Sequence, residues 1–174
     1  MFSGWREEPI RKSHNRADFD CGEPDLNDFL RHHARQNHER GVSKTFVAVD
    51  DADDKSILGY YSLSPASISY ARVPEIISRA QGRYDVGGFR LARLAVSITL
   101  QGQGLGGQFL AAAARRCLRV AAEVGGTILV IDAKNQRAAD WSRAYGAVPT
   151  HDAPLTLVLP LASLTPHMAK AGHI

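Results

Sequence analysis

The stretch Gln101-Gly102-Gln103-Gly104-Leu105-Gly106-Gly107 decides which fold class is expected of this chain. It follows an apolar, strand-like stretch, Leu91–Val96, and opens a helix-like stretch, Leu105–Val124. The first backbone N–H groups of a helix have no acceptor inside the helix, and the helix dipole there favours anions. Glycines let that backbone approach a ligand without a Cβ in the way. The stretch therefore predicts a site for a phosphate-bearing ligand.

Several kinds of loop use glycines in this way. Gly102, Gly104 and Gly107 have the spacing of the dinucleotide fingerprint, and Asp132 could be its ribose-binding acid. Against this, residues 97–101 separate the strand from the first glycine, and too few strands follow for a doubly wound fold. A P-loop is excluded because no Lys-Ser/Thr pair follows the glycines. The alternative that the glycine stretch is only a structural turn, without a ligand, stays open.

The rest of the chain alternates between helical and strand-like patterns. Asp25–Arg40 is expected to be one helix, which begins behind Pro24 and ends at Gly41. Shorter helices are expected at Pro74–Ala80 and Gln136–Tyr145, and strands at Thr45–Val49, Ile57–Leu63, Phe89–Val96, Thr127–Asp132 and Leu155–Leu161. This order predicts an α/β sandwich around one mixed sheet, with residues 1–174 forming a single domain.

Composition and charge are those of an ordinary globular protein. The 174 residues are 44% hydrophobic and carry a net charge of +3, which favours an anionic partner only mildly. No apolar run reaches the roughly 18 residues that span a membrane, and no signal peptide is recognisable, so a cytoplasmic protein is expected. Cys21 and Cys117 match no metal-binding or redox spacing, and no metal is expected.

The glycine stretch resembles a known cofactor motif. Gln101, Gly104 and Gly106 fit Gln/Arg-x-x-Gly-x-Gly/Ala, the acetyl-CoA motif of the GNAT N-acetyltransferases. Further stretches resemble the GNAT toxins of bacterial type II toxin–antitoxin pairs: Phe19–Gly22, Leu26–Leu30, Thr45–Val49, Gly59–Leu63 and Leu91–Val96. The resemblance implies an α+β GNAT fold, in which a central mixed, mostly antiparallel sheet is splayed and flanked by helices.

The resemblance implies acetyl-CoA as the cofactor and assigns residues to it. Backbone groups of Leu94, Ala95 and Val96 would pair with the pantetheine arm as an added strand does. The pyrophosphate would be held by the backbone amides of Gln101, Gly102, Gln103, Gly104, Leu105, Gly106 and Gly107. Asn135 would contact the cofactor from the other wall, and capping the helix that follows is its alternative role.

The residues for catalysis depart from the pattern of the GNAT toxins. The toxins carry aromatic-Tyr-x-x-aromatic-Gly in the last helix, with that Tyr as general acid, but here the Tyr position holds Ser142. A serine hydroxyl is shorter and far less acidic than a phenol. Tyr145, expected on a nearby helical face, or a water held by Ser142 would then be the acid; packing before the helix cap is the alternative role of Tyr145. The backbone N–H of Val96 would be the oxyanion donor.

The resemblance also implies a substrate, the α-amino group of aminoacyl-tRNA, whose acceptor stem basic residues would follow. Arg90 and Arg93 alternate with leucines on the strand and are expected to share one face. Arg79 and Arg83 lie in the adjoining loop. Ordinary solvated charge is the alternative role for all four arginines.

Partners and competing functions complete the expectations. The resemblance implies a ribbon-helix-helix antitoxin, whose acidic or apolar tail would cover the basic cleft, and a homodimer. Two other functions stay open. One is a GNAT enzyme that acts on a small amine or a protein N-terminus. The other is a catalytically weak acetyl-CoA binder that acts with its antitoxin at DNA, an option that Ser142 favours.

Overall fold

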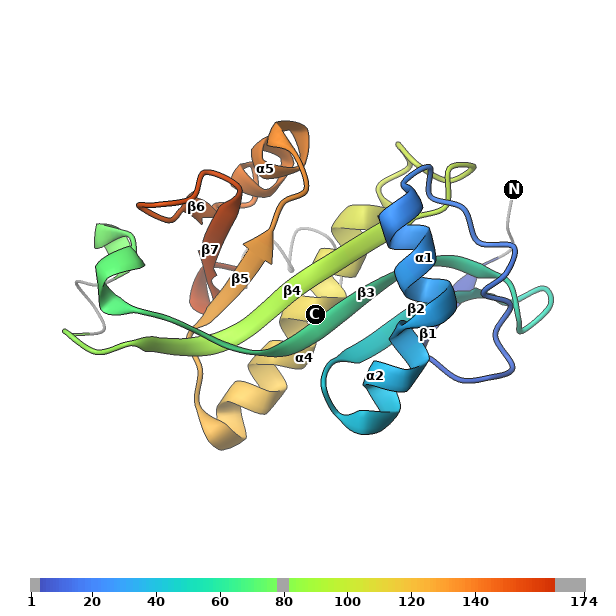
Figure 1. Ribbon diagram of the computed structural model, residues 1–174, viewed down its shortest axis with the longest axis horizontal. Helices are drawn as coiled ribbons and strands as arrows, with labels where there is room; N and C mark the ends of the chain where they lie inside the picture. The colour runs from blue at the N-terminus through green and yellow to red at the C-terminus, as the bar shows by residue number, and fades with distance from the viewer. Residues whose placement is uncertain (1–3, 78–81, 165–174) are drawn as a thin grey trace. The chain divides into compact units, whose positions relative to one another are not determined.

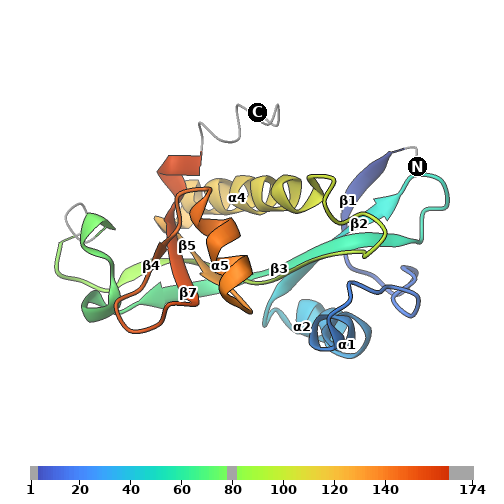
Figure 2. The same cartoon turned by 90° about the horizontal axis from the view of Figure 1, so that it is seen from above.

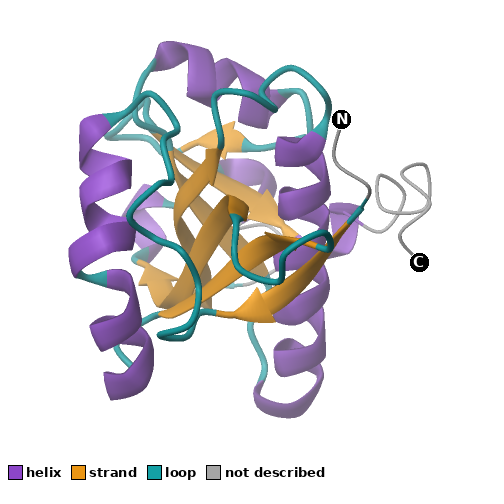
Figure 3. Ribbon diagram, turned by 90° about the vertical axis from the view of Figure 1, so that its right-hand side faces the viewer, coloured by secondary structure: helices purple, strands orange, loops and turns teal. Residues whose placement is uncertain are grey.

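The computed structural model describes residues 4–77 and 82–164 (Figure 1). The described strands are hydrogen-bonded into a seven-stranded sheet in the order β1-β2-β3-β4-β5-β7-β6. Among the strand ladders whose register is described, only that between β4 and β5 is parallel, and helices flank the strands (Figure 3). This is the mixed, mostly antiparallel α+β architecture that the resemblance implies.

The chain divides into two compact units, each of which includes two separate segments. Unit 1 is Met1–Ser64 with Arg93–Phe109, and unit 2 is Pro65–Ala92 with Leu110–Ile174. The single domain expected over residues 1–174 therefore stays a prediction.

Unit 1 is built on three antiparallel strands. These are β1 (Trp5–Pro9), β2 (Lys44–Asp50) and the first part of β3 (Ile57–Ile68). Two helices, α1 (Pro24–His32) and α2 (Ala34–Arg40), cover one face of β2 and β3, as Figures 1 and 2 show. The strand β1 was not expected, because its charged sequence Trp-Arg-Glu-Glu-Pro has no apolar alternation and depends on pairing with β2.

The prediction of one helix over Asp25–Arg40 was wrong, because the helix breaks at His33. The backbone of His33 has φ −128° and ψ −32°, outside the helical range, although its N–H still donates to the carbonyl of Phe29. Leu30 and Ala34 on either side of the break are both completely buried. The expected ends are confirmed, since Pro24 begins α1 and Gly41, with φ 75°, ends α2.

The core of unit 1 gathers around the buried ring of Tyr60. The ring of Phe29 stacks on it at 6.2 Å, and the ring of Phe19 meets it edge-on at 5.8 Å. The Tyr60 hydroxyl donates a 2.8 Å hydrogen bond to the carbonyl of Leu26, and burial raises the pKa of this phenol above its ordinary value. Tyr60 thus ties α1 and the loop before it to β3.

Unit 2 contains the parallel pairing that precedes the glycine stretch. Residues Gly88–Leu91 of β4 (Val86–Val96) pair with Ile128–Ile131 of β5 (Ile128–Asp132). β5 is almost wholly buried, as its uninterrupted apolar sequence predicts. β7 (Thr156–Pro160) pairs antiparallel with β5, and the two-residue β6 (Val148–Pro149), too short to be recognised from sequence, pairs with β7.

The helices of unit 2 follow the expected pattern with small differences. The elements are α4 (Leu105–Val124), which begins in unit 1, α5 (Gln136–Arg143) and the 3₁₀ turns η1 (Tyr70–Arg72) and η2 (Leu161–Ser163). On α4, Cys117 is buried, and burial raises the pKa of its thiol to about 12. Val124, in the last turn of α4, is 76% exposed. The helix expected at Pro74–Ala80 is described only over Glu75–Ile77.

The described residues contain neither a candidate membrane-spanning helix nor a candidate metal cluster. None of their helices is both long and apolar enough to cross a membrane. Nor do they contain three or more His, Cys, Asp or Glu residues grouped so that they could hold a metal ion.

We expect the parallel pairing of β4 with β5 to require glycine at position 88 but not at position 87. A Cβ at Gly88 would overlap the backbone of Ile128, whereas a Cβ at Gly87 would meet nothing within 4 Å. Gly88→Ala should therefore lower the free energy of unfolding by about 1–3 kcal/mol, and Gly87→Ala should change it by less than about 0.5 kcal/mol. Equal effects in urea unfolding would contradict this close approach.

Candidate functional site

The glycine stretch forms the turn between β4 and α4. β4 ends at Val96, and α4 begins at Leu105, whose side chain is buried. Gly102 and Gly104 have φ of 81° and 86°, a left-handed conformation that glycine adopts without strain. A Cβ at either position would meet nothing within 4 Å, so the space in front of this backbone is open. The turn presents the unpaired N–H groups at the start of α4 as an anion site would.

The side chain of Gln101 braces this turn. Its amide Nε2 donates to the carbonyl of Val96 at 2.9 Å and to the carbonyl of Cys21 at 2.9 Å. The first bond closes the turn onto the end of β4, and the second ties it to the loop before α1. The side-chain amide of Gln101 therefore has a structural role. The prediction from sequence assigned to Gln101 only a backbone contact with the cofactor.

The loop at Asp20-Cys21-Gly22 is itself held by a buried amide, that of Asn27. Asn27 accepts from the backbone N–H of Cys21 at 2.9 Å and donates to the Asp20 carboxylate at 2.9 Å. The Asp20 carboxylate also accepts from the N–H of Gly22 at 2.8 Å, and the Asp20 carbonyl accepts from Ile98 at 3.0 Å. The bonds from Gly22 and then Asn27 lower the pKa of Asp20.

Sequence reasoning did not assign a role to Asp20 or Asn27. Both lie in stretches that carry the resemblance, Phe19–Gly22 and Leu26–Leu30, and this was the one signal that could have pointed to them. The hydrogen bonds of Asp20 and Asn27 explain why an acid and an amide lie seven residues apart in this part of the chain. Together they fix the Cys21 carbonyl, which accepts from Gln101.

The end of β4 extends beyond its described pairing with β5. That ladder ends at Leu91, whereas β4 continues to Val96. Within unit 1, a Cβ at Gly59 of β3 would lie 2.7 Å from the carbonyl oxygen of Ala95 and would overlap the ring of Phe109. Close packing at Gly59 thus fixes the backbone at Ala95, between Leu94 and Val96.

In unit 2, Asn135 caps α5. Its Oδ1 accepts a 2.9 Å hydrogen bond from the backbone N–H of Ala138. This confirms the alternative role given to Asn135, and its contact with a cofactor stays a prediction.

Ser142 and Tyr145 have different environments. Ser142 is only 2% exposed, and its hydroxyl donates to the carbonyl of Ala138 at 3.0 Å. Tyr145 was expected in the last helix, but α5 ends at Arg143, and Tyr145 lies half-buried in the following turn. Its ring lies 5.1 Å from that of Trp141, which is partly exposed. Ser142 is thus inside the fold, and Tyr145 lies at its surface.

The prediction that Arg90 and Arg93 share one strand face was wrong, because residues three apart on a strand point to opposite faces. The Arg90 guanidinium contacts both carboxylate oxygens of Asp132 at 2.7 Å. The Arg93 guanidinium lies over the ring of Phe29, 3.7 Å from its centroid. Arg83 is exposed, and Arg79 lies outside the described residues.

The predicted site residues fall into two groups. Unit 1 contains the strand end, the glycine turn and Arg93, and its hydrogen bonds bring the first two together through Gln101. Unit 2 contains the remaining described residues: Arg83, Arg90, Asn135, Ser142 and Tyr145.

We expect the brace to depend on Gln101 and not on the neighbouring Gln103, whose amide reaches the carbonyl of Thr99 only at 3.5 Å. Gln101→Ala removes two hydrogen bonds, each contributing about 0.5–1.5 kcal/mol. Backbone amides of residues 97–104 should then exchange roughly tenfold faster with solvent deuterium. Gln103→Ala is the matched control. If both variants exchange at the same rate, Gln101 does not hold the turn.

Comparison with known proteins identifies relatives across most of the chain, although no family model matches it. A tRNA-acetylating toxin of Mycobacterium tuberculosis is 35% identical over 120 residues, which cover 69% of this chain and 70% of that protein. A probable toxin TacT of Sinorhizobium fredii is 26% identical over 159 residues, which cover 87% of each protein.

Solved structures agree in fold. A tyrosine-to-phenylalanine mutant of KacT superposes with a TM-score of 0.86 at 26% identity, covering 94% of this chain and 98% of that one. A similar mutant of the toxin AtaT, bound to the C-terminus of the antitoxin AtaR, gives 0.81 at 25% identity, with 94% and 97% covered. On the strength of its 35% identical relative, the chain belongs to the GNAT N-acetyltransferases, in the group of GNAT toxins of toxin–antitoxin systems.

Proposed function

We propose that this protein is an acetyl-CoA-dependent N-acetyltransferase that acetylates the α-amino group of aminoacyl-tRNA and so blocks translation. The observation that carries the proposal is the glycine turn at the start of α4, which Gln101 braces against the end of β4 and whose open backbone suits an anion. The M. tuberculosis relative supports the substrate, since it is a tRNA-acetylating toxin.

The residues of the turn fit the cofactor. The left-handed glycines at 102 and 104 leave open the space that a side chain would occupy, so the pyrophosphate of acetyl-CoA can approach the backbone from Gln101 to Gly107. Leu94, Ala95 and Val96 would pair with the pantetheine arm, and Asn135 would make a side-chain contact while it caps α5. Structures of AtaT in complex with acetyl-CoA, at 24% identity, share this fold.

Bound acetyl-CoA would supply an acetyl thioester. The protein would provide the general acid and would stabilise the negative charge that develops during acetyl transfer. The new C–N bond forms as the C–S bond breaks; the amine loses a proton, and the departing thiolate gains one. A free α-amino group has a pKa near 8, so a sizeable minority is neutral at pH 7 and a strong base is not required. The backbone N–H of Val96 would donate to the developing oxyanion.

Tyr145 is the better candidate for the general acid. A phenol is more acidic than a serine hydroxyl, and Tyr145 lies in a surface turn beside Trp141. The hydroxyl of Ser142 is buried and already donates to the carbonyl of Ala138, so neither it nor a water held by it is well placed to give a proton to a ligand. Ser142 instead closes the last turn of α5.

Basic residues would follow the acceptor stem of the tRNA. Arg83 is the most exposed of the described candidates, and Arg79 lies beside it in sequence. Arg90 and Arg93 would contribute less charge to the RNA, because Arg90 is paired with Asp132 and Arg93 stacks on Phe29. We further propose a homodimer in the cytoplasm and a ribbon-helix-helix antitoxin as partner, in line with the AtaT complex with AtaR.

A catalytically weak acetyl-CoA binder that acts with its antitoxin at DNA is the second candidate function. The observation in its favour is Ser142, which is buried and hydrogen-bonded at the position where the resemblance implies a general-acid tyrosine. Such a protein would bind acetyl-CoA with normal affinity and transfer almost no acetyl groups.

The proposal is tested by incubating the protein with radiolabelled acetyl-CoA and a panel of charged tRNAs. We expect label on the α-amino group of at least one aminoacyl-tRNA and none on the same tRNA without its amino acid. Parallel reactions with small amines and with peptides test the other acceptors. Acetyl-CoA binding without transfer to any charged tRNA would overturn the proposal and favour the weak binder.

The same assay assigns the general acid. Tyr145→Phe should slow turnover by at least about tenfold, which corresponds to 1.4 kcal/mol of barrier, without a comparable change in KM for acetyl-CoA. Ser142→Ala is the matched control and should leave the rate nearly unchanged. It removes only the side-chain hydrogen bond to the carbonyl of Ala138, which is also an acceptor within the helix. A slower Ser142→Ala together with a normal Tyr145→Phe would reverse the assignment.

A further inference from the structure

Helix α5 in unit 2 carries a tryptophan, Trp141, on its exposed side. The side chain of Trp141 is 37% exposed, although burial stabilises a large apolar ring. The inward side of the same helix is formed by Ala139 and Ser142, which are buried. The ring of Trp141 lies 5.1 Å from the ring of Tyr145, at an interplanar angle of 60°. Trp141 is therefore a surface aromatic residue directly beside the proposed general acid.

A cationic side chain lies one turn before Trp141 on the same side of α5. Arg137 and Trp141 are four residues apart, so their side chains are neighbours on the helix surface. Arg137 is exposed, and in the described part of the chain no carboxylate pairs with its guanidinium. The nearest acid in sequence, Asp140, accepts a 2.9 Å hydrogen bond from Gln136. The exposed side of α5 thus combines an aromatic ring with an available positive charge.

Backbone hydrogen bonds fix the turn that joins Trp141 to Tyr145. The carbonyl of Ser142 accepts from the N–H of Tyr145 at 3.0 Å and from the N–H of Ala147 at 3.3 Å. The buried hydroxyl of Ser142 holds the last turn of α5 by donating to the carbonyl of Ala138 at 3.0 Å. A ligand group that contacts Trp141 is therefore held at a set distance from Tyr145.

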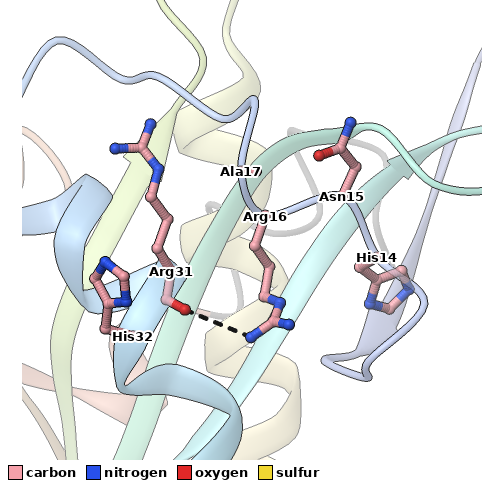
Figure 4. Close-up of a pocket in the computed structure, with 6 residues that line it drawn as sticks. All are labelled: His14, Asn15, Arg16, Ala17, Arg31 and His32. Carbon is pink, nitrogen blue, oxygen red and sulfur yellow. Dashed lines mark hydrogen bonds between the residues drawn. The ribbon is translucent and has the colours of Figure 1, made fainter.

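The hollow beside α1 in unit 1 has no comparable arrangement. Figure 4 shows that the guanidinium groups of Arg16 and Arg31, which line this hollow, point in opposite directions. The Nε atoms of both arginines are buried and out of reach of a ligand. These two arginines are therefore not arranged to bind one group together.

The covalent structure of an aminoacyl-tRNA places a nucleobase near its α-amino group. The amino acid is esterified to the ribose of the 3′-terminal nucleotide, so only an ester, one carbon atom and a sugar separate the amine from the terminal base. If Tyr145 gives its proton at the site of acetyl transfer, the terminal base lies within a nucleotide's length of the Tyr145 ring. The 3′ end of a tRNA is unpaired, and proteins recognise unpaired bases by stacking them on aromatic side chains, with cations along the backbone.

We propose that Trp141 stacks on the terminal base at the unpaired 3′ end of tRNA, and that Arg137 contacts a phosphate of the same end. This inference rests on the proposed function, because it takes Tyr145 as the residue beside the acetylated amine. The stacked base holds the aminoacyl group next to Tyr145. Because every base has a π-face, this contact does not depend on which amino acid the tRNA carries.

Binding of uncharged tRNA to the full chain tests the stacking contact without acetyl transfer. Trp141→Ala should weaken binding at least about fivefold, and Trp141→Phe, which keeps a ring, should weaken it less than about twofold. Val120→Ala shortens another exposed apolar side chain, on α4, and should bind like the natural protein. A tRNA without its 3′-terminal nucleotide should bind equally to Trp141→Ala and to the natural protein. Equal binding of intact tRNA by these two proteins would overturn the proposal.

The fluorescence of Trp141 distinguishes the terminal base of tRNA from the adenine of acetyl-CoA. The chain has two tryptophans, so Trp5→Phe leaves Trp141 as the only one. In this variant, intact tRNA should quench the fluorescence, and neither the shortened tRNA nor acetyl-CoA should do so. Quenching by acetyl-CoA but not by tRNA would assign the ring to the cofactor and overturn the proposal.

The salt dependence of tRNA binding tests Arg137. Arg137→Gln should reduce the slope of log affinity against log salt by about 0.7, as expected for one contact with a single-stranded phosphate. Arg143→Gln is the matched control, because Arg143 is also exposed on α5 but lies two residues from Trp141, on another side of the helix. Equal slopes for the two variants would overturn the role of Arg137.

Acetylation kinetics separate the stacking contact from a structural role of Trp141. Trp141→Ala should raise KM for charged tRNA at least about fivefold and leave KM for acetyl-CoA unchanged. A lower kcat with unchanged KM and unchanged tRNA binding would mean that Trp141 only orients Tyr145, and the proposal would be wrong. If tRNA binds through Trp141 but receives no acetyl group, the proposed function fails and the stacking contact stands.

Discussion

The side-chain amide of Gln101 is the contact on which the candidate site depends. With two hydrogen bonds it joins the end of β4, the glycine turn and the loop before α1. That loop is in turn fixed by Asn27 and Asp20. A turn of several glycines would otherwise sample many backbone conformations, because glycine loses more conformational freedom on folding than any other residue. The brace therefore lets an open, exposed backbone keep one conformation.

Two further constraints place the strand end beside this turn. Gly59 allows β3 to approach the carbonyl of Ala95, and Tyr60 next to it anchors α1 through the carbonyl of Leu26. The same strand thus holds the backbone at Ala95 and the helix that carries Asn27. Unit 1 is in this sense a support for the turn, and its aromatic core around Tyr60 explains why α1 must lie against β3.

The features that local sequence determines were predictable. The glycine turn, the long helix after it and the buried strand at Ile128–Asp132 each have a pattern within a few residues. Three features could not be predicted from the sequence: the strand β1, the break at His33 and the brace from Gln101 to Cys21. Each of them depends on partners distant in sequence. The face shared by Arg90 and Arg93 was an error in strand periodicity. The sequence showed that Ser142 is unusual, but only the structure shows that Ser142 is buried and that its hydroxyl donates to the carbonyl of Ala138.

The proposed function depends most directly on the glycine turn holding acetyl-CoA. Amide NMR spectra recorded as acetyl-CoA is added test this residue by residue. We predict that the backbone amide signals of Gly102, Gly104, Gly106 and Gly107 shift together and saturate, as N–H groups that donate to a pyrophosphate should. Saturable binding that leaves these four signals unchanged would contradict the account, because the cofactor would then lie elsewhere.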